Sequence, residues 1–268
     1  MSMIVKPDSG GHWYSIGERC GYTNFAIPQY DKTLRDFRKE PLLPSVTTVD
    51  REKSNFTLDA WKQEQLLMAA LTLPEIPGES IDDRIKRIMI DAREHGKLAA
   101  EKGDIFHSLM ERKLKGEDPD ISEYDNWITE GIRKASEWME MEQATSEYIE
   151  QSFACVEYGY ACRIDWSGGL GGYRTLVDFK TQGTKPGKKI NKYDSWERQL
   201  AANAMAMPNK IDRWINIIVS TTEPGRIEIV EHKDDDIRQA WLVFYHLLQV
   251  FTLSRSMGEW NVDEMRYM

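Results

Sequence analysis

The chain has 268 residues, of which 41% are hydrophobic and 10% aromatic, so we expect a folded protein with a substantial core and exclude a disordered chain. Its net charge of −9 argues against a broadly basic surface, although clustered acidic metal ligands lower the net charge without opposing an anionic partner once a cation is bound. No apolar run reaches the length of a membrane span and the N-terminus has no signal-peptide pattern, so we expect no membrane partner and an intracellular, cytoplasmic location.

The cysteines are Cys20, Cys155 and Cys162, and they are scattered along the chain. They are too few for a disulfide framework or a zinc cage, so we expect a reducing compartment. They also cannot supply the ligands of a four-cysteine iron–sulfur cluster, and we predict no such cofactor.

Residues 1–42 are expected to form an irregular N-terminal segment, because Gly10-Gly11, Pro28 and Pro41 interrupt it. Trp13, Tyr14 and Ile16 could add a small strand to this segment. The function of this part of the chain cannot be inferred from its residues.

Residues 43–268 are expected to form a single domain whose helical part covers residues 56–141. Apolar residues at helical spacing predict helices over 56–73, 80–100 and 124–141. Lys102-Gly103 is expected to break the second helix before a shorter one that ends at Lys115.

The sheet core of this domain is expected over residues 147–232, followed by a C-terminal amphipathic helix over 235–255. Runs rich in β-branched and aromatic residues predict the strands. These runs are 148–158, 159–165, 173–182, 213–222 and 226–231.

Within the run 173–182, Asp178 and Lys180 leave the same face of the strand, because side chains alternate along it. A carboxylate can hold a hard divalent cation, and a lysine beside it can steady a water or a phosphate oxygen. Such a pair is also typical of an exposed ion pair at a strand end, and the two interpretations need further residues to separate them.

The run 159–165 ends in Asp165, and the glycine-rich Ser167–Gly172 that follows it suits a hairpin turn. Antiparallel pairing across this turn would bring Asp165 close to Asp178. We therefore predict two carboxylates that share one Mg²⁺ or Mn²⁺ ion.

Four motifs in this order resemble the RecB-type branch of the PD-(D/E)XK nucleases, in particular the mitochondrial genome maintenance exonuclease group and its phage relatives. The motifs are Gly103-x-x-x-His107-x-x-x-Glu111, Gly159-Tyr-Ala-x-x-Ile-Asp165, Asp178-x-Lys180-Thr181 and Gln199-Leu-Ala-Ala202. The resemblance covers roughly residues 43 to 206. It implies an α/β fold with a restriction-endonuclease-like core, in which a central mixed β-sheet is flanked by helices, and a helical N-terminal elaboration.

The resemblance also implies a ligand set in which the backbone carbonyl of Phe179 and the imidazole of His107 join Asp165 and Asp178. A histidine ligand favours Mn²⁺, since imidazole suits transition metals better than Mg²⁺. A lone histidine is more often structural, and it is the fit of His107 to the motif that makes it a candidate.

The remaining catalytic roles follow from the same resemblance. Lys180 would orient the attacking water or stabilise charge on the phosphate, and Gln199 would assist near the lysine and the substrate. Glu111 is either a ligand or a support for one. An acid on the first core strand is either Glu150 or Glu147.

The loop after the Asp-x-Lys strand is flexible and basic, which suits contact with a nucleic-acid backbone. Its candidate contacts are Lys185, Lys188, Lys189 and Lys192. Asn203 is a further candidate because it points the same way as Gln199, although the family usually has tyrosine at that position.

We therefore expect a metal-dependent DNA exonuclease that acts on single strands or duplex ends in recombination, repair or replication, with a possible recombination or replication protein as partner. Two alternatives stay open. One is a structure-specific endonuclease or junction resolvase with the same chemistry, and the other is a catalytically silent DNA-binding module on the same fold.

Overall fold

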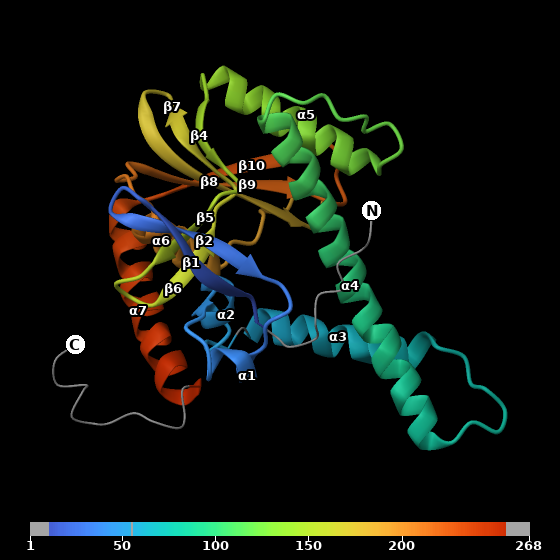
Figure 1. The fold of residues 1–268 in the computed structure, drawn as a ribbon. Helices are drawn as coiled ribbons and strands as arrows, with labels where there is room; N and C mark the ends of the chain where they lie inside the picture. Colours follow the sequence, from blue (N-terminus) through green and yellow to red (C-terminus); the bar gives the residue numbers. More distant parts are fainter. Residues whose placement is uncertain (1–10, 55, 256–268) are drawn as a thin grey trace. The chain divides into compact units, whose positions relative to one another are not determined.

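Two five-stranded β-sheets with the helices packed on them make up the mixed α/β fold of the larger of two compact units (Figure 1). The computed structural model describes residues 11–54 and 56–255. The larger unit comprises Met1–Lys53 with Glu111–Met268, and the smaller unit comprises Ser54–Met110.

The first sheet has the strand order β3-β1-β2-β5-β6. Its strands are β1 (Trp13–Cys20), β2 (Thr23–Gln29), β3 (Leu43–Pro44), β5 (Ser152–Cys155) and β6 (Tyr160–Arg163). The segment expected to be irregular therefore forms an antiparallel hairpin, β1–β2, whose turn contains Gly21 at φ 61°. Glycine adopts this left-handed backbone at little cost, which lets the hairpin close. Residues 1–10 of that segment lie outside the described residues.

The second sheet has the strand order β10-β9-β8-β7-β4. Its strands are β4 (Thr145–Ile149), β7 (Trp166–Leu170), β8 (Tyr173–Gln182), β9 (Arg213–Ser220) and β10 (Ile227–His232). Strands β8 and β9 run parallel, and the other neighbours run antiparallel. The predicted strand over 173–182 therefore lies at the centre of this sheet, with a partner on each side.

Between β4 and β7 the chain changes from one sheet to the other twice, at Glu150–Gln151 and at Ile164–Asp165. Backbone hydrogen bonds join the two crossings, from Glu150 N–H to the Asp165 carbonyl (2.9 Å) and from Ile164 N–H to the Gln151 carbonyl (3.0 Å). The β4–β5 and β6–β7 connections therefore cross between the sheets next to each other. This junction brings two acidic residues, Glu150 and Asp165, next to each other.

The core of the larger unit lies under helices α2 (Val46–Asp50), α6 (Asp194–Ala206) and α7 (Asp234–Arg255). Helix α6 contacts strands of both sheets, so it is well placed to carry residues toward their junction. Helix α5 (Asn126–Met141) packs against β9 and β10, and α1 (Leu34–Phe37) follows the β1–β2 hairpin. The largest fully buried side chains include Phe153, Tyr160, Trp166, Phe179 and Phe244.

The smaller unit consists of α3 (Phe56–Thr72) and most of α4 (Ile81–Leu114). The break expected at Lys102-Gly103 is absent, because α4 continues through both residues. A glycine inside a helix costs only about 1 kcal/mol relative to alanine, which the surrounding helix formers can offset. None of the helices in the described part of the chain combines the length and the apolar character that a membrane span requires.

Candidate active site

Asp178 and Lys180 lie on the same face of β8 and form an ion pair in which the carboxylate is buried and the ammonium is half-buried. The Lys180 Nζ donates to Asp178 Oδ1 at 3.0 Å and lies 2.8 Å from Oδ2. The side chain of Asp178 is 2% exposed and that of Lys180 is 19% exposed. An exposed ion pair, the alternative that the motif allowed, does not describe this arrangement.

The Lys180 ammonium also donates to Gln199 Oε1 at 2.8 Å. Gln199 comes from α6, and Lys180 comes from the central strand, so one ammonium joins two elements that 19 residues separate in sequence. Two of the sequence motifs therefore meet at Lys180. This contact fixes the ammonium between a carboxylate and an amide oxygen.

Asp165 lies directly before β7 and accepts a hydrogen bond from the Phe179 backbone N–H at 2.7 Å. The residue is partly exposed to solvent, but protein atoms surround its carboxyl group closely, and this burial has the largest influence on its pKa. Burial, and next the neighbouring carboxylate of Asp178, raise the pKa of Asp165 to about 7. Lys180 and the Phe179 N–H act in the opposite direction. The two aspartates thus repel each other when both are ionised.

The hairpin that carries these acids differs from the predicted one. The strand after Asp165, β7, pairs with β8, whereas the predicted partner, β6, belongs to the other sheet. Within β7, a Cβ at Gly168 would collide with the Thr145 carbonyl, so this glycine allows close approach of β4 rather than a turn. Gly171 and Gly172, with φ of 58° and 86°, make the actual turn.

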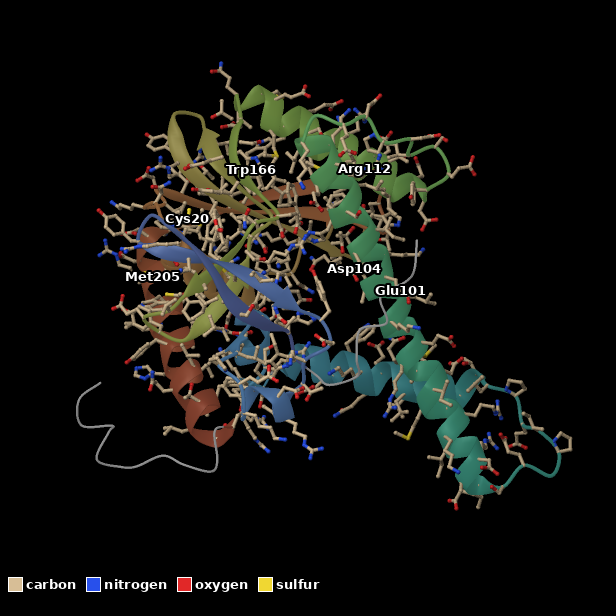
Figure 2. All side chains as sticks on the ribbon, in the orientation of Figure 1. Cys20, Glu101, Asp104, Arg112, Trp166 and Met205 are labelled. Atoms are coloured by element: carbon tan, nitrogen blue, oxygen red, sulfur yellow. The ribbon has the colours of Figure 1, made fainter. Side chains whose placement is uncertain are left out.

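The residue after Asp165 fixes the start of β7. Trp166, which is labelled in Figure 2, is fully buried. Its indole N–H donates to the Ser146 hydroxyl at 2.8 Å. Trp166 pairs with Val177 of β8. Asp165 is therefore held one position beyond this pair, at the same end of the sheet as Asp178.

Glu150 is the acid of the first core strands that approaches Asp165. Carboxylate oxygens of the two residues lie within 4.8 Å of one another, and Arg163 Nε donates to Glu150 Oε2 at 2.6 Å. The competing Glu147 instead accepts from Asn209 at 2.7 Å. Glu150 has a φ of 50°, a left-handed backbone that is costly for a residue other than glycine. Such strain is often retained at functional sites.

Glu111 lies beside this pair, with its Oε2 4.0 Å from Arg163 and its Oε1 accepting from Lys115 at 2.6 Å. This geometry gives Glu111 a supporting position through Arg163. His107 stands one turn before Glu111 in α4 and belongs to the smaller unit. Its part in a metal site stays a prediction, as does that of the Phe179 carbonyl.

The donor set of the larger unit fits a hard divalent cation. Glu150 and Asp165 offer carboxylate oxygens within 4.8 Å of one another, and such oxygens suit Mg²⁺ and Mn²⁺, whereas Asp178 does not lie within that distance of both. Burial and, next, the Asp178 carboxylate raise the pKa of Asp165, and a bound cation would oppose both effects by favouring the ionised form.

The loop between β8 and α6 presents its lysines to solvent. Lys185, Lys188, Lys189 and Lys192 are exposed, and none of them forms an ion pair within the described ranges 11–54 and 56–255. The loop backbone is nevertheless held, because Arg226 donates to the carbonyls of Lys185 (3.2 Å) and Lys188 (2.5 Å). Ile190, which is 5% exposed, packs against Trp196.

Asn203 does not join these surface residues. Its side chain is 2% exposed, among the buried residues of α6. A buried amide offers no hydrogen bond to a nucleic acid outside the fold, so Asn203 leaves the set of candidate contacts.

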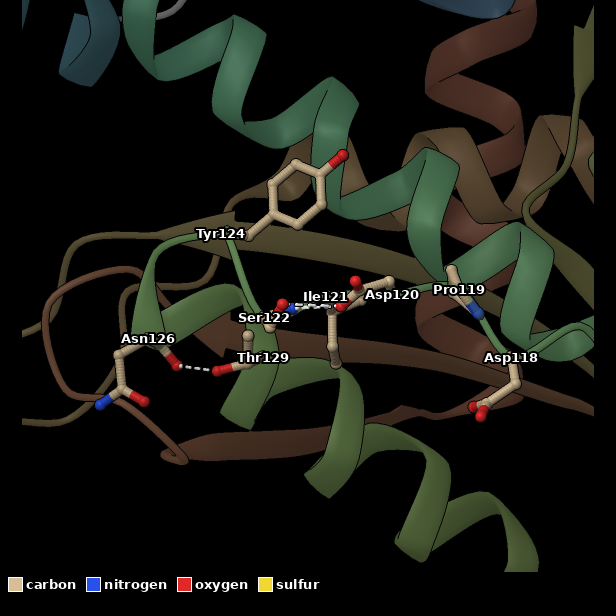
Figure 3. A pocket seen from close by; sticks show the side chains of 8 residues that line it. All are labelled: Asp118, Pro119, Asp120, Ile121, Ser122, Tyr124, Asn126 and Thr129. Atoms are coloured by element: carbon tan, nitrogen blue, oxygen red, sulfur yellow. Dashed lines mark hydrogen bonds between the residues drawn. The ribbon is translucent and has the colours of Figure 1, made fainter.

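A concave surface lies on the loop before α5 and involves none of the predicted residues (Figure 3). This hollow of about 820 Å³ is open and is lined by Asp118, Asp120, Ser122, Tyr124 and neighbouring residues. Asp120 accepts from the backbone N–H and the hydroxyl of Ser122 at 3.0 and 2.8 Å. Its carboxylate therefore stabilises the local turn.

Sequence reasoning missed Asn216 and His232, which lie behind Asp178. Asn216 of β9 is fully buried and donates to Asp178 Oδ2 at 2.6 Å, and His232 of β10 contacts Asn216. One signal was available, because Asn216 is a polar residue inside the strongly apolar run Trp214–Val219. Nothing in the sequence ties His232 to that position.

No family model matches this chain, and no curated protein matches it. A solved structure described as the crystal structure of SSO0001 is similar at 14% sequence identity and a TM-score of 0.33. The match covers 80% of this chain and 93% of that chain. A likeness of this strength supports no conclusion about fold or function.

Proposed function

We propose that the chain is a metal-dependent DNA exonuclease that hydrolyses phosphodiester bonds on a PD-(D/E)XK core of the RecB type. The observation that carries this proposal is the Lys180 ammonium, which contacts both Asp178 of β8 and Gln199 of α6. These residues belong to two separate motifs of the resemblance. They meet beside Asp165, which belongs to a further motif. This meeting supports a shared chemical role, because a purely structural ion pair would require neither Gln199 nor Asp165.

In this proposal Asp165, Asp178 and Glu150 hold Mg²⁺ or Mn²⁺, with His107 and the Phe179 carbonyl as further ligands. The bound cation would neutralise charge on the scissile phosphate and lower the pKa of a coordinated water. The close carboxylates of Glu150 and Asp165 support this donor set. Glu111 supports Glu150 through Arg163.

Lys180 stabilises the negative charge that develops on the phosphate, or orients the attacking water. Its contact with Gln199 gives the ammonium a second partner, besides the Asp178 carboxylate, that holds it in place. A preorganised charge of this kind costs no reorganisation during the reaction. Gln199 is therefore proposed as a positioning residue for Lys180.

The exposed lysine loop binds the phosphate backbone of the DNA. Its four lysines, Lys185, Lys188, Lys189 and Lys192, follow the β8 strand directly, so a strand of DNA bound there would lead toward Asp178. Contacts to phosphate position a nucleic acid without reading its sequence. This arrangement suits an enzyme that degrades DNA of any sequence.

The experiment that tests the proposal compares a labelled linear DNA, carrying its label at the 5′ or the 3′ end, with a closed circle of the same sequence. Each is incubated with Mg²⁺, Mn²⁺ or EDTA. We expect stepwise shortening of the linear DNA with a divalent ion, an intact circle and no cleavage in EDTA. A cut circle would favour the endonuclease, and binding without any cleavage would favour the silent module.

A further inference from the structure

A chain of hydrogen bonds runs from Asp178 through the interior of the larger unit to helix α6. Asn216 Nδ2 donates to Asp178 Oδ2 at 2.6 Å and to the Asp178 carbonyl at 3.3 Å. Asn216 Oδ1 lies 2.7 Å from His232 Nε2, and His232 Nδ1 lies 3.2 Å from Glu197 Oε1. Asn216 is fully buried and His232 is 9% exposed, so water does not replace these partners.

The strand pairing explains why these residues meet. Asp178 of β8 is the register partner of Asn216 in β9, and Asn216 is in turn the register partner of Val230 in β10. His232 lies two residues beyond Val230, on the same face of β10. Three neighbouring strands therefore supply one residue each, and α6 supplies Glu197, two residues before Gln199.

The partners of Asn216 determine which way its amide points. The carboxylate and carbonyl oxygens of Asp178 can only accept hydrogen bonds, so the NH₂ group of Asn216 must face β8. The amide oxygen must then face His232, so the Nε2 atom of His232 must carry a hydrogen. The other ring nitrogen, Nδ1, lies 3.2 Å from the Glu197 carboxylate, to which it donates only when it also carries a hydrogen.

We infer that Asn216 and His232 are positioning residues for Asp178, and that they leave Asp178 Oδ1 as the oxygen offered to a divalent cation. Asp178 Oδ2 accepts a hydrogen bond from Asn216 and also contacts Lys180. Asp178 Oδ1 accepts from Lys180 and makes no hydrogen bond to Asn216. This inference rests on the proposed function. It adds that the buried face of the central sheet, in addition to the ligands themselves, sets the affinity of the site for its cation.

The inference is tested by titrating Mn²⁺ into the wild type and into two variants, Asn216→Leu and His232→Phe. Asn216→Leu removes the amide at similar volume, and His232→Phe keeps a ring without its nitrogens. We expect both to bind Mn²⁺ about 10- to 100-fold more weakly, as the loss of a partner of a metal ligand typically does. His232→Gln, which retains a donor, should recover part of the affinity.

The matched control is His246→Phe, which changes an exposed histidine of α7. It should bind Mn²⁺ like the wild type. Folded variants at positions 216 and 232 with unchanged Mn²⁺ affinity would overturn the inference, with folding checked by circular dichroism.

A second measurement does not depend on the variants folding or on cleavage. The ¹⁵N signals of His232 in the wild type should show Nε2 in its protonated form, and an unprotonated Nε2 would overturn the inference while leaving the proposed function intact. Conversely, a wild type that binds no Mn²⁺ and cleaves no DNA would refute the proposed function. The Nε2 signal would then still report whether the hydrogen-bond chain exists.

Discussion

The charged side chains at the end of β8 and those in the loop that follows it differ in burial and in pairing. Asp178 is buried and Lys180 is half-buried; the two are paired with each other and held by Asn216 and Gln199. The loop lysines, only a few residues later, are exposed and have no ion-pair partner among the described residues. Charges that act on one phosphate must be fixed, because catalysis depends on placement. Lysines that bind a flexible polyanion need no fixed position, because they act by displacing the counterions condensed on its phosphates.

The largest effect is expected from Asp178→Asn, which keeps the shape of the side chain and removes its charge. Cleavage should fall by at least about 10²- to 10³-fold, the loss typical for one electrostatic stabiliser of a transition state. Mn²⁺ should bind much more weakly, whereas DNA binding should persist through the loop. Single-turnover cleavage and Mn²⁺ titration measure the two effects, and a variant that still cleaves normally would contradict the comparison.

Lys180→Ala should also reduce cleavage, by about 10²-fold, because it removes the ammonium that we propose lies beside the scissile phosphate. Unlike Asp178→Asn, it should titrate Mn²⁺ almost normally, since the carboxylates stay. The variant leaves the buried Asp178 with Asn216 as its remaining side-chain partner, which could lower stability. Thermal unfolding is therefore measured as the control. Cleavage at the wild-type rate would show that the ammonium only neutralises Asp178.

Replacing Lys185, Lys188, Lys189 and Lys192 together with alanine should affect binding more than chemistry. Each lost phosphate contact should reduce the slope of log affinity against log salt by about 0.7 to 0.9. Cleavage at saturating DNA should survive in part, because the acidic cluster is unchanged. An unaltered salt dependence would reduce the loop to a solvated connector.

The last expected effect concerns stability without metal. The pKa of Asp165 is raised to about 7 from an ordinary value of 3.8, so the native state binds the extra proton between roughly pH 4 and pH 7. The contribution of Asp165 to unfolding free energy should therefore fall as pH rises through this window, by at most about 1.4 kcal/mol per pH unit.

Asp165→Asn should remove this slope, whereas the four-lysine variant should keep it. Urea unfolding in EDTA at several pH values measures the difference. Equal slopes in the wild type and Asp165→Asn would mean that the carboxyl group is not perturbed as described.

The local chemistry of β8 was predictable because it depends on neighbours in sequence. Its bounds, Tyr173–Gln182, agree with the run of β-branched and aromatic residues, and the alternation of side chains put Asp178 and Lys180 on one face. The position of Gln199 near Lys180 was expected from the family resemblance alone, because 19 residues separate the two in sequence. These features need no knowledge of which strands pair.

Features that depend on strand pairing were not predictable. Glycines of Ser167–Gly172 suit both a turn and a strand with a close neighbour, and only the position of β4 decides between them. The division into two sheets moved the run 159–165 away from β8. Asn216 meets Asp178 because β9 lies parallel to β8 in one particular register, which no local pattern specifies.

The most direct test of the central claim is single-turnover cleavage of an end-labelled linear DNA in Mn²⁺ by the wild type and Asp178→Asn, at protein concentrations that saturate binding. The account predicts metal-dependent release of nucleotides by the wild type and a loss of about 10²-fold or more in the variant, with equal amounts of DNA bound. Binding without cleavage by the wild type, or equal rates for both proteins, would contradict it.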